Sequence, residues 1–223
     1  TRLFISKSMI KISAYCLPDI KLLEESNTRY LIWIPDKPYI VLGASNHPED
    51  SLNLENVLKD NITVLKRPSG GQAVVLTPNN LIISVVITGE KALKPKDVFH
   101  HINSLLISAM KEAGIDNLSL MGISDIALSG KKISGSAIYR NKDRLLYHAV
   151  LNLCEPASTF ERYLKHPLKE PFYRNGRKHI DFVISLKEKG YIENDAKLSS
   201  IISYVYNSFS KVEWNSMFAI LPR

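Results

Sequence analysis

Short apolar runs separated by turn residues recur through the first 155 residues and limit the folds open to this chain. Three brief runs, Tyr30 to Ile34, Tyr39 to Leu42 and Ile62 to Leu65, are rich in β-branched and aromatic side chains, which favour strands. Leu81 to Ile87 and Leu145 to Leu153 are longer runs of the same kind. Helical spacing appears between them, so we expect an α/β (α+β) fold, with a mixed, largely antiparallel sheet flanked by helices.

Local signals predict how some of these segments are joined. Pro35-Asp36-Lys37-Pro38 separates the first two runs, and its prolines and Asp predict a turn that makes the two runs a hairpin. Leu52 to Leu58 has leucines at helical spacing, with Asn53 as the expected N-cap. Lys96 to Ala113 has apolar residues at helical spacing and precedes Gly114, which predicts a core-packing helix.

Size and composition restrict the class of protein. With 223 residues, 45% of them apolar and 23% charged, the chain fits one soluble domain over residues 1–223, without a C-terminal accessory domain. The N-terminal apolar stretch is interrupted by Lys7 and Lys11, so no secretory segment is expected and a cytoplasmic location is the default. Cys16 and Cys154 are too few for a disulfide framework.

The charge balance favours an anionic partner. A net charge of +7 and a pI near 9.3 suit a nucleic acid, a membrane surface, a nucleotide or an acidic protein. Charge alone does not choose among these. The densest basic segment, residues 165–179, fits either a solvated face or a docking surface.

Two segments carry residues suited to chemistry. Arg67-Pro68-Ser69-Gly70-Gly71-Gln72-Ala73-Val74 places a glycine pair between two strands, where backbone N–H groups can approach a phosphate or carboxylate; an ordinary hairpin turn is the alternative. Gly122 to Asp125 and Gly130 to Ala137 form short strands and turns that should bring Asp125 and Lys132 close together on one sheet.

These motifs resemble those of the lipoate–protein ligase family, whose catalytic domain is of the biotin/lipoate ligase kind. Arg67 to Val74 is similar to its arginine-x-serine-glycine-glycine-x-alanine-valine motif, and Asn80 falls at its following asparagine. Gly122 to Ala137 resembles the second motif and Tyr147-His148 the third. The three motifs occur in the family's order, and the resemblance covers roughly residues 28–155.

The resemblance implies that lipoate is bound in an apolar tunnel, activated with ATP to lipoyl-AMP, and passed to a carrier lysine. Lys132 would be catalytic, stabilising charge at the acyl carbonyl and the α-phosphate. Asp125 would contact the nucleotide or its Mg²⁺. The other implied substrate- or nucleotide-binding residues are Arg67, Ser69, Gly70, Gly71, Gln72, Ala73, Asn80, Ser134, Gly135, Ala137 and His148. Asn80 could instead merely shape its turn.

The implied partner is an acidic lipoyl carrier domain or a glycine-cleavage H-like protein. A separate accessory subunit could be a further partner, and no membrane partner is expected. The sequence also departs from the family's pattern, because Gln72 stands at a usual glycine and Leu76 at a usual histidine. A side chain at position 72 could narrow the adenylate site, so nucleotide use is less firmly implied than acyl binding.

Other functions stay open. An acyltransferase of the same fold needs an activated thiolate, but the second motif has no cysteine, residues 164–167 read Leu-Lys-His-Pro, and Cys154 is expected to be buried. The glycine- and arginine-rich loop of biotin ligases is absent. A non-catalytic module that binds a lipoylated protein is a further alternative. Nucleic-acid binding has only the charge in its favour, because the sequence has no stacked-aromatic platform and no recognisable binding motif.

Overall fold

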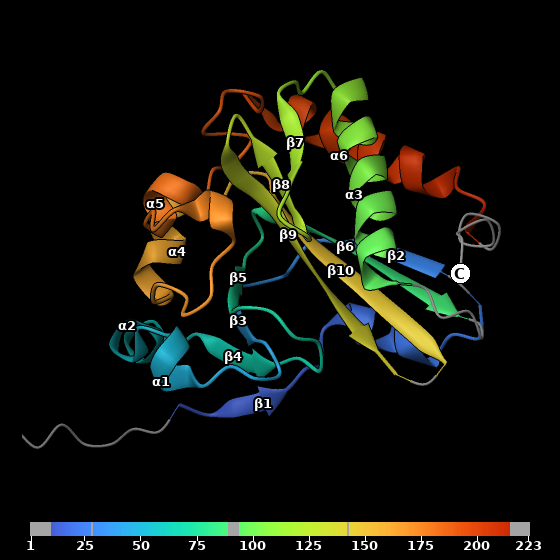
Figure 1. Ribbon diagram of the computed structural model, residues 1–223. Coiled ribbons are helices and arrows are strands. Elements are labelled where there is room, and N and C mark those ends of the chain that lie inside the picture. Colours follow the sequence, from blue (N-terminus) through green and yellow to red (C-terminus); the bar gives the residue numbers. More distant parts are fainter. Residues whose placement is uncertain (1–9, 28, 89–93, 142, 215–223) are drawn as a thin grey trace, which may run out of the picture.

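The computed structural model describes residues 10–27, 29–88, 94–141 and 143–214, and contains two sheets (Figure 1). The larger is antiparallel, in the order β2 (Arg29–Trp33), β6 (Asn80–Thr88), β10 (Arg144–Asn152), β9 (Lys131–Arg140), β8 (Asp125–Leu128) and β7 (Leu118–Met121). The smaller is mixed, in the order β1 (Ile12–Ala14), β4 (Thr63–Lys66), β3 (Tyr39–Leu42) and β5 (Val74–Leu76). The predicted α/β class with largely antiparallel strands is confirmed, with two sheets in place of one.

Two long helices cover one face of the larger sheet, α3 (Pro95–Glu112) and α6 (Asp195–Ser210) (Figure 1). The predicted helix over residues 96–113 is therefore confirmed. Its buried face includes Ile102 and Leu106, which pack in one core cluster with Ile83 and Val85 of β6. Alternate residues of β6 face the opposite side and join other clusters, so this central strand is apolar on both faces.

The predicted hairpin of the first two strands is wrong, although both strands exist. β2 pairs with β6 in the larger sheet, whereas β3 pairs with β4 and β5 in the smaller one. A strand has only two hydrogen-bonding edges, and both edges of β3 are occupied. Tyr30 of β2 instead packs its ring against Phe209 and Trp214.

The loop of residues 67–73 is not a hairpin turn either. It joins β4 to β5, and these strands lie on opposite sides of β3, so the loop must cross the end of β3. This crossover carries the glycine pair. Close packing at the crossing is visible at Gly43, directly after β3, where an added Cβ would lie 2.1 Å from the carbonyl oxygen of Gly71.

The shorter helices are α1 (Pro48–Ser51), α2 (Leu54–Lys59), α4 (Ala157–Tyr163) and α5 (His179–Phe182), with the 3-10 turn η2 (Phe172–Arg174) between the last two. A second 3-10 turn, η1 (Pro18–Glu24), packs against β2, β6 and β10 of the larger sheet. Asn53 precedes α2 as expected, but its side chain does not cap the helix. Its Nδ2 donates to the carbonyls of Glu161 and Arg162, which ties α2 to α4. In the described ranges, no helix combines the length and apolarity that crossing a membrane requires.

Candidate functional site

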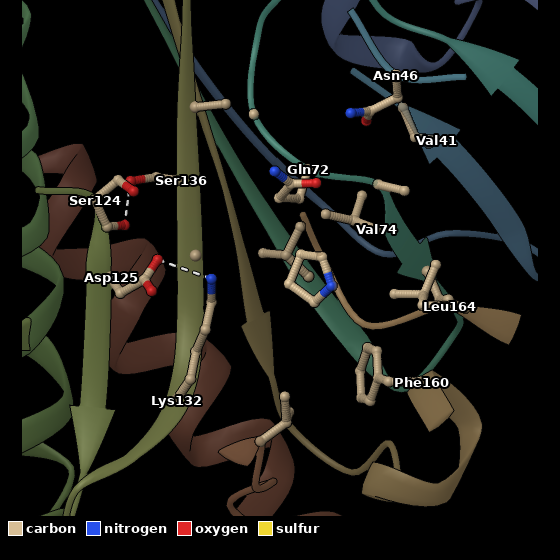
Figure 2. Close-up of a pocket in the computed structure, with 18 of the residues that line it drawn as sticks. Val41, Asn46, Gln72, Val74, Ser124, Asp125, Lys132, Ser136, Phe160 and Leu164 are labelled. Carbon is tan, nitrogen blue, oxygen red and sulfur yellow. Dashed lines mark hydrogen bonds and ion pairs between the residues drawn. The ribbon is translucent and has the colours of Figure 1, made fainter. Parts of the chain in front are cut away.

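A cavity of about 580 Å³ opens between the two sheets. Strands β3 and β5 line one side, β8 to β10 another, and α4 and α5 a third (Figure 2). Val41, Val74, Phe160 and Leu164 give part of the wall an apolar surface, while Lys132 and Asp125 lie on the opposite side. Such a cavity suits a ligand with an apolar chain and a charged head.

Lys132 and Asp125 form an ion pair at the cavity wall, with 2.8 Å between Nζ and Oδ1. The predicted proximity is thus confirmed. Asp125 is buried, and its Oδ2 accepts a hydrogen bond of 2.9 Å from the hydroxyl of Tyr173. The carboxylate is therefore held from two sides, and it fixes the position of the ammonium, which is partly exposed to the cavity.

A β-bulge brings these groups to one face of the sheet. Asp125 pairs with Gly135 and Ala127 with Lys132, so three residue steps on β9 oppose two on β8. In a regular strand, residues three apart point to opposite faces, but the extra residue restores Lys132 to the face of Asp125 and Gly135. An added Cβ at Gly135 would lie 2.6 Å from both Cε and Nζ of Lys132, so this glycine provides the space that the lysine occupies.

Arg67 holds the crossover loop together from inside. The residue is buried; its Nη2 donates to the carbonyls of Gly70 and Gln72, each at 2.8 Å, and its Nη1 donates to Val41. Burial lowers the pKa of Arg67 to about 10, which leaves it charged at neutral pH. Gly71 adopts the positive φ of +91° that its glycine allows. Most donors of Arg67 thus shape the loop, and its direct contact with a substrate remains a prediction.

A buried polar chain runs from Arg67 to the 3-10 turn η1. Arg67 Nε donates to Ser69 Oγ (2.9 Å), which lies 2.7 Å from His148 Nε2. His148 Nδ1 lies 3.5 Å from Oδ2 of Asp19, a fully buried carboxylate. Ser69 Oγ accepts from Arg67 and faces Nε2 of the imidazole, while Nδ1 faces the carboxylate of Asp19, so both ring nitrogens of His148 have a polar neighbour.

Asp19 is ionised despite its burial. Burial by itself would raise its pKa, but the contact with His148 and the hydrogen bonds from Tyr15 and Ser84 outweigh that effect and keep the pKa below its usual value. Sequence reasoning missed Asp19 and Tyr15, because they lie outside the motifs and reach His148 only through the fold.

The remaining predicted residues divide into two groups. Besides Arg67, Asp125, Lys132 and Gly135, the cavity is lined by Gly71, Gln72, Ala73, Ser134, Ala137 and His148. Ser69, Gly70 and Asn80 are not part of the lining. Asn80 shapes its turn, as its Oδ1 accepts from the backbone N–H of Thr77 and its Nδ2 donates to Asn152. Ser134 Oγ is buried without a hydrogen-bond partner in the described structure.

The residues present do not form a magnesium site of their own. Both oxygens of Asp125 already accept from Lys132 and Tyr173. No group of three or more His, Cys, Asp or Glu side chains suited to a metal occurs within the described ranges. Mg²⁺ often reaches proteins on substrate phosphates with few protein ligands, and a nucleotide could bring it to this cavity in that way.

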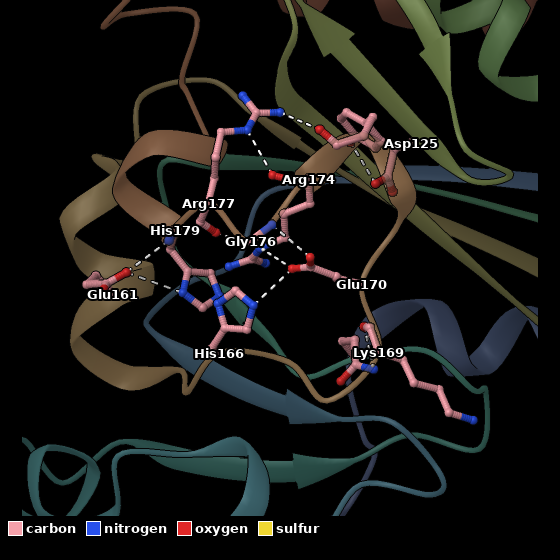
Figure 3. A network of polar contacts seen from close by, with 11 residues as sticks. Asp125, Glu161, His166, Lys169, Glu170, Arg174, Gly176, Arg177 and His179 are labelled. Atoms are coloured by element: carbon pink, nitrogen blue, oxygen red, sulfur yellow. Dashed lines mark hydrogen bonds and ion pairs between the residues drawn. The ribbon is translucent and has the colours of Figure 1, made fainter.

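Sequence reasoning also missed the segment that follows α4 (Figure 3). Arg174 is buried at the cavity wall; its Nε donates to the carbonyl of Arg177, and its Nη2 has no hydrogen-bond partner. His179, another lining residue, has a pKa lowered to about 4, first by burial and then by the charge of Arg174. The basic character of residues 165–179 was the only sequence signal for this wall.

Comparison with solved structures identifies the class of fold. A chain from the structural analysis of a bipartite lipoate protein ligase and its E2 lipoyl domain from Thermoplasma acidophilum superposes with a TM-score of 0.70, at 19% identity over 90% of this chain and 83% of that chain. A lipoate-protein ligase A bound with ATP superposes with a TM-score of 0.66, at 19% identity over 86% of this chain and 79% of that chain. A T. acidophilum chain with bound lipoic acid superposes with a TM-score of 0.68, at 17% identity over 90% of this chain and 84% of that chain.

The family model of the lipoyl protein ligase A/B catalytic domain matches residues 12–210, and the chain belongs to this family. Lipoate-protein ligase LplJ of Bacillus subtilis is 28% identical over 145 residues, 64% of this chain and 41% of its own length. Lipoate-protein ligase A of Psychrobacter cryohalolentis is 32% identical over 133 residues, which are 58% of this chain and 37% of that protein's length. The chain thus covers about two fifths of the length of these relatives.

Proposed function

We propose that this protein is a lipoate–protein ligase, which activates lipoate or a close acyl relative with ATP and transfers it to a lysine of a lipoyl carrier domain. The observation that carries this proposal is the Lys132 ammonium, positioned by Asp125 in a cavity whose facing wall is apolar. The names of the relatives support it, as do the related structures with bound ATP and with bound lipoic acid.

The first half-reaction forms a mixed anhydride. A carboxylate oxygen of the acid attacks the α-phosphorus of ATP, the bond to the bridging oxygen breaks, and pyrophosphate leaves with the electron pair. Negative charge gathers on the α-phosphoryl oxygens, which Lys132 can stabilise as a point charge. Arg174, also in the cavity wall, adds a second positive charge there, which Glu170 partly offsets.

The second half-reaction moves the acyl group. The neutral amine of a carrier lysine attacks the acyl carbon, the amide bond forms, and AMP leaves as the anhydride bond breaks. Lys132 can stabilise both the developing oxyanion and the departing phosphate. The N–H groups of the crossover loop, whose carbonyls are turned toward Arg67, are further candidates for donors to these oxygens.

The competing acyltransferase would need a cysteine at the acyl group. The chain has two, and neither belongs to the cavity lining. Cys154, expected to be buried, is partly exposed, and burial raises the pKa of its thiol, which opposes thiolate formation. Cys16 is exposed. A non-catalytic module is disfavoured by the ion pair that places Lys132, which a binding role alone does not require.

Carrier and location are inferred with the same proposal. An acidic lipoyl domain or H-like protein suits the basic chain, and the related archaeal system was analysed with its E2 lipoyl domain. A separate accessory subunit and a cytoplasmic location stay predictions.

The test is acyl transfer to a lipoyl domain, followed by mass spectrometry, for the wild type and for Cys16→Ser and Cys154→Ser. Free lipoate with and without ATP is compared with an octanoylated carrier as donor. We expect transfer from lipoate that requires ATP and survives both substitutions. ATP-independent transfer from the carrier donor, lost in Cys154→Ser, would establish the acyltransferase instead. Adenylate formation without transfer would point to a required accessory subunit.

A further inference from the structure

The most exposed large apolar side chains of the described chain lie on two loops beside the cavity. These rim loops are residues 122–124 and residues 165–172. Ile123 is 70% exposed, Leu168 84% and Phe172 fully exposed at 101%. Elsewhere in the described ranges, no large apolar residue exceeds the 53% of Tyr206. Single exposed apolar side chains are ordinary on protein surfaces, whereas several that lie on neighbouring loops indicate an interaction surface.

The two rim loops meet at one mouth. A Cβ built on Gly122 would lie 3.7 Å from Cβ of Pro171, an ordinary contact distance. Ile123 and Leu168 both line the cavity. The second rim loop also reaches the crossover loop, where Nε2 of Gln72 donates to the carbonyl of Lys169. A macromolecule that inserts a side chain into this cavity therefore meets the rim loops.

Cations accompany the apolar groups. Lys165 and Lys169 are exposed on the second rim loop. The acidic residue of that loop, Glu170, is engaged with His166 at 2.9 Å and with Arg174 at 3.5 Å (Figure 3). Its charge is thus offset within the loop, and the mouth presents apolar side chains beside the ammonium groups of Lys165 and Lys169, of which Lys165 also donates to the carbonyl of Glu49. This combination complements an acidic surface with apolar residues at its centre.

We infer that the rim loops form the docking surface for the acidic carrier domain, with Phe172 and Leu168 as apolar anchors and Lys165 and Lys169 as the complementary charges. The inference rests on the proposed function, because it takes the occupant to be the acyl acceptor. An acceptor lysine has only a four-carbon stem with which to reach the ammonium of Lys132. The carrier surface around that lysine must therefore come to the mouth and touch both loops.

Phe172 is the residue on which to test this, because it is fully exposed and lies outside the cavity lining. Three substitutions separate shape from charge: Phe172→Ser, Phe172→Asp and Phe172→Lys. Ile34→Ser is the matched control, since Ile34 is 45% exposed and does not line the cavity. Two half-reactions are measured, pyrophosphate release from ATP and lipoate, and acyl transfer from lipoyl-AMP to an acidic lipoyl domain.

We expect Phe172→Ser to lower kcat/KM for the carrier about tenfold, as loss of an aromatic anchor does. Phe172→Asp should lower it further through repulsion, and Phe172→Lys less than Phe172→Asp. Pyrophosphate release should stay within about twofold of wild type in all three, and Ile34→Ser should match wild type in both assays. Equal effects of Asp and Lys, unchanged transfer, or a parallel loss of pyrophosphate release would each overturn the inference.

Binding gives an answer that does not depend on catalysis. A ¹⁵N-labelled apo lipoyl domain titrated with this protein should show shifts around its target lysine, and Phe172→Asp should abolish them. If the wild type formed no adenylate yet bound the carrier through Phe172, the proposed function would fail and the docking surface would stand. If Phe172→Asp instead changed only the self-association of this chain in sedimentation, the surface would belong to a second copy and the inference would be wrong.

Discussion

Gly135 leaves open the space through which the side chain of Lys132 reaches Asp125. A Cβ at position 135 would lie 2.6 Å from both Cε and Nζ of Lys132, closer than real contacts allow. The identity of one small residue therefore controls where the ammonium of another lies. This relationship separates the effect of removing the charge from the effect of moving it.

Removing the charge is the simpler case. Lys132→Ala should lower the rate of adenylate formation by about 10²–10³-fold, because a positioned cation that stabilises developing negative charge is lost. The substitution also leaves the buried carboxylate of Asp125 without its cation, so the melting temperature should fall while the protein stays folded at the assay temperature. Stopped-flow measurement of pyrophosphate release and a thermal melt check both statements. A rate within twofold of wild type would exclude the assigned role.

Moving the charge is tested with Gly135→Ala. The added methyl group meets the flexible end of a lysine, so the fold should survive while the ion pair with Asp125 breaks. We expect at least a tenfold loss in kcat in a variant that stays folded, as checked by urea denaturation. Gly130→Ala is the control. It strains a position with φ of +79° where a Cβ meets nothing within 4 Å, so it should lower stability more than activity.

Gly43→Ala tests the crossover loop from a distant position in the sequence. Its Cβ would lie 2.1 Å from the backbone oxygen of Gly71, and a backbone group cannot move aside as a side chain can. Such overpacking typically costs about 1–3 kcal/mol. Calorimetric titration with a non-hydrolysable lipoyl-adenylate analogue should show weakened binding. Unchanged affinity in a folded variant would mean that the loop does not contact the ligand.

Asp19→Asn should disturb the buried polar chain. The NH₂ group of asparagine replaces one acceptor oxygen by a donor, so the hydrogen bond from either Tyr15 or Ser84 is lost, at an expected cost of about 1–3 kcal/mol. Since the pKa of Asp19 is lowered by folding, its contribution is complete well above pH 4 and is lost as the pH falls through the lowered value. The difference in unfolding free energy between wild type and variant should therefore shrink at acidic pH. A difference that is independent of pH would contradict this account.

His179 also makes stability depend on pH, but through a different cause: burial disfavours its charged form, whereas hydrogen bonds favour the charged form of Asp19. Its pKa is lowered from 6.5 to about 4, so between these values the unfolded chain binds a proton that the folded chain does not. The free energy of unfolding should therefore fall as the pH drops from about 6.5 to about 4. His179→Gln should remove that slope. NMR titration of His179 in Arg174→Met should show a higher pKa than in the wild type.

Much of the site could be predicted from the sequence because its motifs are local. The strand–turn–strand pattern around Asp125 and Lys132 predicted their proximity. The bulge that aligns Lys132 with Gly135 was not predictable, since an extra residue in a ladder leaves no periodic signal.

The misassigned hairpin and the missed residues have one cause. Whether β2 pairs with β3 depends on which other strands compete for the edges of β3, and local turn chemistry carries no information on that competition. Tyr173 meets Asp125 across 48 residues, and Asp19 meets His148 across more than a hundred. Contacts of this kind are set by packing, so a single sequence could not reveal them.

The division of the site between two sheets has a consequence for folding kinetics. The crossover loop belongs to the four-stranded sheet and Lys132 to the six-stranded one, so neither sheet alone can create the cavity. A refolding intermediate with one finished sheet would show part of the native circular dichroism signal and no ligand affinity. The recovery of ligand binding after dilution from denaturant is therefore tied to the step in which the sheets dock, and it marks the end of folding rather than the first appearance of strands.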